Sequence, residues 1–405
     1  MEPEHGIENR NFEMTGKVAP KRIALVSSYA PSLTRFRFDL IRALIAEGHH
    51  VTAFAPENDR AVADTLADIG CDFEVLPMAR TGTNPLADAV LLMRLVRAFQ
   101  RLRPDVVISY TMKPVIYGGI AARLAGVPER HALMTGLGYV FADPDPRGKR
   151  RILRDVSVRL YRAGLRGVGR AFVYNGADED DIRRFAMLDD NSKLIRVAGT
   201  GVNLERFAHR AFPEGAPKFL VIARLLADKG VREFVAAAKR LKPEYPDAEF
   251  RILGPLDPNP KGIKPDEIEK WTEDGIVTYL GETDDVRPYL SDASVFVLPS
   301  YYREGIPRSI LEAMATGRPV ITTTLPGCGD TVEDGVSGFL VAPRDANALA
   351  DVMRKFLDDT DLALQMGKEA RARAEAVFDI HKVNSHLLTE MNLGAARHPS
   401  STRAA

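Results

Sequence analysis

Two glutamates, Glu304 and Glu312, stand eight residues apart and enclose Gly305, Ile306 and Pro307. Pro307 suits the first turn of a helix, where its missing N–H costs nothing. Apolar residues at helical spacing follow, so we expect Glu304 in the preceding loop and Glu312 about a turn and a half inside the helix. Free N–H groups at this helix start could hold a diphosphate, with one carboxylate at a sugar and the other at a ribose. The alternative interpretation is an exposed helix with two solvated acids.

Two cations, Arg224 and Lys229, lie where a predicted strand over residues 218–225 ends and the next loop begins. A diphosphate leaving group needs positive charge, because negative charge builds on it as the glycosidic bond breaks. Arginine can bind two oxygens at once, whereas lysine acts as a point charge. Both residues are therefore candidates for diphosphate binding, although on spacing alone ordinary surface cations are the stronger interpretation.

A weaker group of candidates lies in the first half of the chain, where Lys113, Gly136 and Gly138 follow apparent strands. Glycine lets the backbone approach a substrate closely, and Lys113 could pair with a phosphate. Acceptor or diphosphate binding is the functional interpretation. Turns between packed elements explain the same spacing equally well.

The elements that must position these residues form two series of buried strands and amphipathic helices. Strands are predicted at residues 21–28, 48–55, 105–110, 171–174 and 194–197, and then at 218–225, 249–254, 276–281, 294–300 and from 319. Strands that alternate with helices predict an α/β fold with two Rossmann-like, doubly wound domains. A cleft between the carboxyl ends of the two sheets would hold a nucleotide sugar.

The length of 405 residues, the hydrophobic content of 45% and the net charge of zero fit a two-domain globular protein without a broad nucleic-acid surface. Cys71 and Cys328 fall in different predicted domains, and no apolar stretch is long enough to span a bilayer, so we expect a reduced, cytoplasmic protein. The predicted divisions are a disordered tail at 1–19, a first domain at 20–198, a linker at 199–217, a second domain at 218–375, a helix at 376–394 and a disordered tail at 395–405.

The motif from Glu304 to Glu312, the apolar strand before it and the glycine-containing loop at 326–341 resemble the retaining glycosyltransferases of family 4, which carry two glutamates separated by seven residues. The resemblance covers roughly residues 20–390. It implies the GT-B fold, in which two Rossmann-like domains face a cleft and the last helix crosses back to the first domain. One departure is Gly329, where similar proteins often have arginine.

The resemblance also implies roles for single residues. Glu304 would contact the donor sugar, while Arg224 and Lys229 hold the diphosphate, and these three form the catalytic set. The implied donor-binding residues are Glu312 at the ribose, Gly305, Ile306, Pro307, Gly281 from a loop against the base, and Gly201 from an interdomain segment.

Segments 110–118 and 134–141, with Ser32-Leu33 and Phe36-Arg37, resemble a bacterial subgroup that extends polyprenyl-diphosphate-linked sugars. Some of its members transfer galactose or N-acetylgalactosamine from a UDP donor. This implies a nucleotide-sugar donor and a lipid-linked acceptor in surface polysaccharide or glycan assembly. A UDP-sugar 2-epimerase of the same architecture and a non-catalytic subunit of an assembly complex are the alternatives.

A basic segment runs from Arg147 to Arg170, with nine Lys or Arg residues, one acid and interleaved apolar residues such as Ile152 and Val156. A basic amphipathic helix can lie on anionic lipid, so we expect peripheral contact with the inner face of the cytoplasmic membrane. A solvated helix face with a core side is the alternative. No cluster of metal ligands stands out, and we expect an enzyme without a metal or other cofactor.

Overall fold

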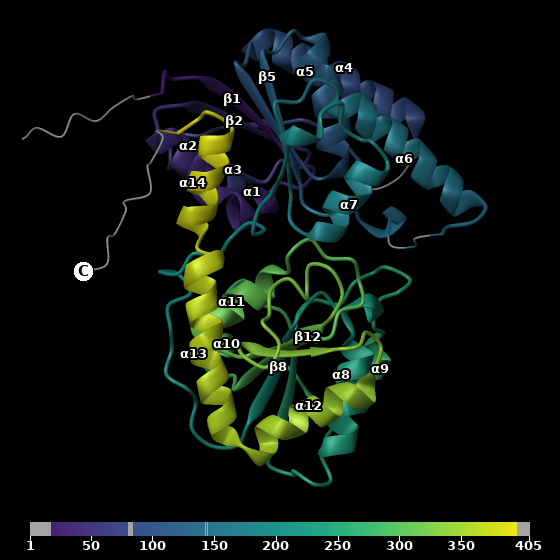
Figure 1. Ribbon diagram of the computed structural model, residues 1–405, viewed down its shortest axis with the longest axis vertical. Helices are drawn as coiled ribbons and strands as arrows, with labels where there is room; N and C mark the ends of the chain where they lie inside the picture. Colours follow the sequence, from purple (N-terminus) through teal and green to yellow (C-terminus); the bar gives the residue numbers. More distant parts are fainter. Residues whose placement is uncertain (1–17, 80–83, 142, 144, 395–405) are drawn as a thin grey trace, which may run out of the picture.

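Figure 1 shows the computed structural model of the chain, which describes residues 18–79, 84–141, 143 and 145–394. Within these residues the chain forms two α/β domains, stacked along the long axis of the molecule. The predicted disordered tails at 1–19 and 395–405 lie outside the described residues, apart from residues 18 and 19.

The first domain contains a parallel sheet with helices on both faces. Its strands are β1 (Arg22–Val26), β2 (His50–Ala55), β3 (Asp72–Val75), β4 (Val106–Tyr110), β5 (Glu129–Met134), β6 (Arg170–Val173) and β7 (Leu194–Arg196). Its helices are α1 (Pro31–Phe36), α2 (Phe38–Ala46), α3 (Arg60–Ala67), α4 (Pro85–Leu102), α5 (Gly119–Leu124), α6 (Lys149–Leu165) and α7 (Gly176–Arg184), with short turns η1 (Pro114–Gly118), η2 (Tyr139–Phe141) and η3 (Asn191–Lys193). The strand order β3-β2-β1-β4-β5-β6-β7 is that of a Rossmann sheet.

The second domain repeats this plan with the strand order β10-β9-β8-β11-β12-β13. Its strands are β8 (Lys218–Ile222), β9 (Glu249–Leu253), β10 (Thr278–Tyr279), β11 (Val295–Leu298), β12 (Val320–Thr323) and β13 (Gly338–Val341). The helices that follow β7 are η4 (Ala227–Lys229), α8 (Val231–Leu241), α9 (Pro265–Glu273), α10 (Arg287–Ser291), α11 (Arg308–Thr316), α12 (Ala346–Asp358), α13 (Thr360–Val377) and α14 (Ile380–Glu390). The predicted fold of two Rossmann-like domains is therefore confirmed.

Four strands differ from the sequence prediction: β10 is shorter, β3 and β13 were not predicted, and β5 was implied only as an apparent strand before Gly136. Strand β10 is shorter than the predicted 276–281, because the N–H groups of Ile276 and Val277 donate to the carbonyl of Trp271 at the end of α9 rather than to a strand. Strand β3 was not predicted. It lies at the edge of the first sheet with no buried residue, so it lacks the apolar run that indicates a buried strand. Strand β13 lies at the edge of the second sheet, inside the segment 326–341 that was expected to be a loop.

The last two helices connect the domains along one side of the molecule (Figure 1). Helix α13 packs on α11 of the second domain, whereas α14 packs on α2 of the first. Val383, Leu387 and Met391 lie in the same apolar cluster as the buried face of α2. At the crossing point, the N–H of Val202 donates to Phe378 over 2.7 Å, and the N–H of Ile380 donates to Val202 over 3.0 Å. None of the described helices is both long and apolar enough to cross a membrane.

The packing of α14 predicts that it stabilises the first domain. Leu387 is 1% exposed, and its replacement by alanine should lower the free energy of unfolding by about 2–5 kcal/mol, because a cavity is left in the core. Leu364, which is 41% exposed on α13, provides the control, and Leu364→Ala should change stability little. Thermal unfolding of both variants measures the difference, and equal shifts would show that α14 is not part of the core.

Candidate active site

A cavity of about 1130 Å³ lies between the two domains, at the carboxyl ends of both sheets. The first domain contributes residues that follow β1 and β4, together with residues of α6. The second domain contributes the end of β8 and the start of α11. The predicted site residues among its lining are Lys113, Arg224, Lys229, Glu304, Gly305, Ile306 and Pro307.

Lys229 and Glu304 form an ion pair on the second-domain side of this cavity. Lys229 ends the turn η4, and its Nζ lies 5.6 Å from the ring centroid of Tyr302. Ser300 Oγ donates to the same Glu304 oxygen over 2.9 Å. The two charged side chains are 17% and 12% exposed, so the ammonium lies at the cavity wall in a fixed place. A fixed cation of this kind can stabilise charge on a leaving phosphate.

Arg224 lies at a more open part of the same wall. Its side chain is 58% exposed, and its Nη1 donates to Asp257 over 3.0 Å. An exposed ion pair of this kind contributes little to stability, which leaves the guanidinium available to an anionic ligand at small cost.

Helix α11 begins where the sequence predicted, with Pro307 as its N-cap residue and Gly317 in a left-handed conformation after its last turn. Glu312 lies inside the helix but does not line the cavity. Its carboxylate accepts from Arg308 Nε over 2.8 Å, and both side chains are 14% exposed. Burial raises the pKa of Glu312, and the neighbouring Arg308 guanidinium opposes that rise. Arg308, which sequence analysis did not single out, therefore stands between Glu312 and the cavity.

The loop before α11 touches the first domain through its backbone. A methyl group at Gly305 would lie 2.2 Å from the carbonyl oxygen of Thr135, so no larger residue fits without a backbone shift. Gly136, a predicted site residue, lies beside this contact rather than in the cavity lining. Glu304 is therefore held at the point where the two domains meet.

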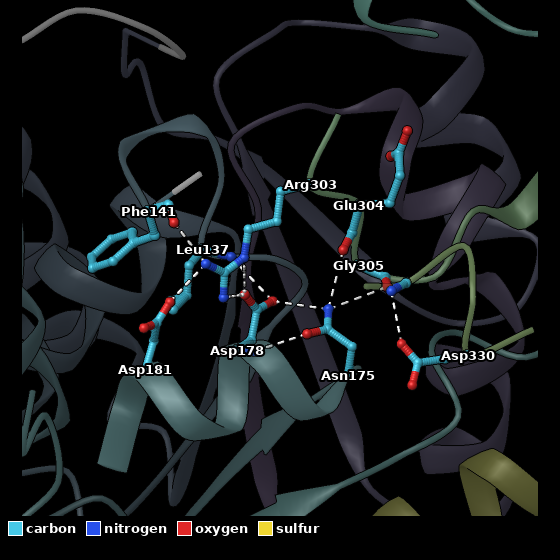
Figure 2. A network of polar contacts seen from close by, with 10 residues as sticks. Leu137, Phe141, Asn175, Asp178, Asp181, Arg303, Glu304, Gly305 and Asp330 are labelled. Atoms are coloured by element: carbon cyan, nitrogen blue, oxygen red, sulfur yellow. Dashed lines mark hydrogen bonds and ion pairs between the residues drawn. The ribbon is translucent and has the colours of Figure 1, made fainter. Parts of the chain in front are cut away.

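A polar network centred on Arg303 also holds this loop against the first domain (Figure 2). Arg303 Nε donates to Asp178 over 3.0 Å, and its Nη1 donates to Asp181 over 2.6 Å and to the carbonyl of Phe141 over 2.7 Å. Asn175, the N-cap residue of α7, donates its side-chain amide to the Glu304 and Gly305 carbonyls over 3.1 and 3.3 Å. Because Asp178 and Asn175 are fully buried, this first-domain cluster fixes the backbone of Glu304.

Sequence analysis missed this network. Arg303 directly precedes the glutamate motif, but its partners Asp178 and Asp181 lie more than a hundred residues earlier, in α7. Nothing in the spacing of these residues indicates that they meet.

The remaining predicted residues lie away from this centre. Lys113 lines the cavity, but its Nζ is paired with Asp88 over 2.7 Å, with both side chains nearly buried. Gly138 lies near Tyr302 at the domain contact. Gly201 packs against the backbone of Ile380, where a methyl group would come within 2.7 Å, and the cavity lining includes neither it nor Gly281. Among the described residues, no group of three or more His, Cys, Asp or Glu is arranged to hold a metal ion.

Models of two protein families match the chain. One, described as a glycosyl transferase 4-like domain, matches residues 34–195, and the other, described as glycosyl transferases group 1, matches residues 216–359. The two matches fall in the first and second domains, on either side of the cavity. Together the two glycosyltransferase models match most of the chain, which is a glycosyltransferase.

Two curated relatives resemble this glycosyltransferase over most of their length. It is 28% identical over 366 residues to the N,N'-diacetylbacillosaminyl-diphospho-undecaprenol alpha-1,3-N-acetylgalactosaminyltransferase of Campylobacter jejuni, covering 86% of this chain and 93% of the relative. It is 28% identical over 311 residues to the UDP-Gal:alpha-D-GlcNAc-diphosphoundecaprenol alpha-1,3-galactosyltransferase of Escherichia coli, covering 73% and 77%. The structure of sucrose-phosphate synthase from Thermosynechococcus elongatus matches with a TM-score of 0.75 at 23% identity, covering 91% of this chain and 98% of that one, which supports the fold.

The Arg303 network of the glycosyltransferase predicts a pH-dependent stability. Burial raises the pKa of Asp178 from its ordinary 3.8, and Arg303 opposes that rise. Arg303→Met should raise this pKa further. A carboxyl group with a higher pKa in the folded state than in the unfolded state loses stability as pH rises from the unfolded pKa through the folded pKa. The variant should therefore be destabilised by about 3–5 kcal/mol at pH 7 and by less at pH 5.

Melting temperatures at the two pH values measure this difference. The double variant Arg303→Met, Asp178→Asn is the control, because it has no carboxyl group to titrate at this position and should lose the dependence. Equal losses at pH 5 and pH 7 in the single variant would show that Arg303 does not neutralise Asp178.

Proposed function

We propose that this enzyme is a retaining glycosyltransferase that moves a hexose or N-acetylhexosamine from a UDP-sugar to a polyprenyl-diphosphate-linked acceptor sugar, in the assembly of a bacterial surface polysaccharide or glycan. The observation that carries the proposal is the interdomain cavity, with Lys229, Arg224 and the start of α11 on its second-domain side. The printed names of the Campylobacter and Escherichia relatives, which describe acceptors linked to diphosphoundecaprenol, support the acceptor class.

The charges of the cavity are consistent with departure of the leaving group and attack of the acceptor on the same face of the sugar. Lys229 and Arg224 stabilise the diphosphate as the bond between the sugar and its phosphate breaks. The acceptor hydroxyl forms the new glycosidic bond, and its proton passes to the leaving phosphate oxygen. Two carboxylates line the cavity in the described part of the chain, Glu304 and Asp88, and each is paired with a lysine. Neither pair resembles a free nucleophile with a separate acid, which favours a mechanism without a covalent intermediate on the enzyme. We also propose that no metal takes part.

The test is transfer by the purified enzyme from a panel of UDP- and GDP-sugars to a polyprenyl-diphosphate sugar, with products identified by mass spectrometry and their anomeric configuration by NMR. We expect a retained configuration and activity that survives a chelator. Lys229→Ala should lower turnover roughly 10²-fold, because it removes one charge aimed at the leaving group. Arg240→Ala, at an exposed position on α8, is the matched control.

Two results of this assay would contradict the proposal. Interconversion of the UDP-sugar without an acceptor would favour a 2-epimerase. Normal turnover by Lys229→Ala would place the diphosphate elsewhere.

We also propose that the enzyme is cytoplasmic and contacts the inner face of the cytoplasmic membrane through the N-terminal end of α6. Lys149, Arg150 and Arg151 are exposed there, and Ile152 beside them is 65% exposed. The later part of the helix, by contrast, buries Val158, Tyr161 and Leu165 in the core. Arg154 is unsuited to lipid contact, because it lies over the ring of Phe185 at 5.1 Å with 13% of its side chain exposed.

This arrangement predicts that Lys149, Arg150 and Arg151 replaced together by serine will reduce sedimentation with anionic vesicles. Each cation near such a surface contributes about 1 kcal/mol, an effect that salt screens. The control replaces Lys239, Arg240 and Lys270, three exposed cations of the second domain. Equal binding by both triple variants at low salt would favour an ordinary solvated face for α6.

A further inference from the structure

The first domain has its own ligand-binding position at the cavity. Its strand order reverses between β1 and β4, and in open α/β sheets ligands bind outside the carboxyl ends of the strands at this point. Ser28 follows β1 and Thr111 follows β4, and both line the cavity. Thr111 has a φ of 68°, which is rare for a β-branched residue and is found where structure is held for function.

Arg37 lies in this position as a buried cation without a counter-charge. It is 2% exposed, and it also lines the cavity. Its Nη2 donates to the hydroxyl of Tyr174 over 2.6 Å, and its guanidinium carbon lies 4.8 Å from the ring centroid of Tyr110. Its Nε is buried without a partner, and no described carboxylate forms an ion pair with it. Burial of an unpaired charge is costly, so an anionic ligand is the expected partner.

The other cations of the cavity differ from Arg37 in this respect. Lys229, Lys113, Arg224 and Arg308 are paired with Glu304, Asp88, Asp257 and Glu312. Lys149 also lines the cavity, but it is exposed, so water solvates its charge. Sequence analysis proposed Lys113 as a phosphate ligand in the first domain, but Asp88 already neutralises its charge. Arg37 is therefore the better candidate for binding an anion.

Hydroxyl groups complete the position. Ser32 Oγ lies 2.7 Å from the hydroxyl of Tyr110, and Ser28 Oγ lies 2.7 Å from Thr111 Oγ1. All four of these residues line the cavity with Arg37. Ser32 Oγ donates to the carbonyl of Tyr29 over 2.5 Å, so its hydrogen is already used. In the pair of Ser28 and Thr111 only one hydroxyl donates to the other, which leaves the second hydrogen for a ligand oxygen, and such a donor together with an arginine suits a phosphate group.

We propose that Arg37, together with the Ser28 and Thr111 hydroxyls, binds the diphosphate of the acceptor, an assignment that rests on the proposed function. The donor diphosphate has cations of its own on the second domain, Arg224 and Lys229, whereas Arg37 belongs to the first. The first-domain wall of the cavity is also apolar, which suits the isoprenoid chain that follows such a diphosphate. Its apolar side chains include Met112, Ile116, Val140, Leu153, Val156 and Leu160.

The test compares two acceptors that carry the same sugar, one as a soluble short-chain prenyl diphosphate and one as a neutral alkyl glycoside. Arg37→Gln should raise the KM of the diphosphate acceptor by about 10- to 100-fold, the effect of losing a hydrogen bond to a charged group. It should leave unchanged the KM of the alkyl glycoside and the Kd of UDP. Arg37→Lys should restore part of the loss. Arg42→Gln, an exposed change on α2, is the control and should alter none of these values.

Three outcomes would overturn the assignment: an unchanged KM for the diphosphate acceptor, an equal loss with both acceptors, or weaker UDP binding in folded Arg37→Gln. If that variant does not fold, the assignment is tested by calorimetry, which measures the binding of inorganic pyrophosphate to protein already saturated with UDP. The parent should bind it and Arg37→Lys should bind it more weakly, while equal binding overturns the assignment. Failure of the parent to transfer sugar to either acceptor counts against the proposed function, whereas the pyrophosphate titration still tests Arg37.

Discussion

The contact between the backbones of Gly305 and Thr135 is the constraint on which the site depends. It leaves no room for a side chain, so the loop that carries Glu304 is held directly against the first domain. Arg303 and Asn175 fasten the same loop by hydrogen bonds to buried groups (Figure 2). A buried ion pair adds little net stability, but it defines one arrangement, because a displaced Asp178 or Arg303 would lose its partner. The network thus determines where Glu304 and its partner Lys229 lie relative to the first domain.

The cations on the two walls of the cavity differ in whether a carboxylate neutralises them. On the second domain, Lys229 is held by Glu304, so under the proposed function the cation is in place before the donor diphosphate binds. A phosphate bound beside it would compete with Glu304 for the ammonium group, and charge that grows on that phosphate would strengthen the new interaction. On the first domain, Arg37 has no carboxylate to compete with among the described residues, and its cost of burial is offset when an anion binds.

The chain crosses between the domains twice at neighbouring places, which limits how the cavity can open. The segment at Val202 is hydrogen-bonded to the backbone at Phe378 and Ile380, where α13 gives way to α14. These hydrogen bonds tie the two crossings together, so they form one joint between the domains. Gly201 belongs to this joint, since its close contact is with Ile380. It is not among the residues that line the cavity.

The sequence by itself determined the two Rossmann-like domains, because buried parallel strands and amphipathic helices leave periodic apolar patterns that local reading detects. It also located α11, its proline start and its glycine end, and with them the positions of Glu304 and Glu312 on the chain. It did not find the edge strands β3, which has no buried residue, and β13, which lies in a segment expected to be a loop.

Only the tertiary structure decided which side chains meet. The pairs Lys229 with Glu304, Lys113 with Asp88 and Arg303 with Asp178 join residues between 25 and 125 positions apart. No spacing rule connects residues so far apart in sequence, since their meeting depends on the order of strands in each sheet and on the contact between the domains. For the same reason, the isolation of the Arg37 charge was visible only once every carboxylate around it had been placed.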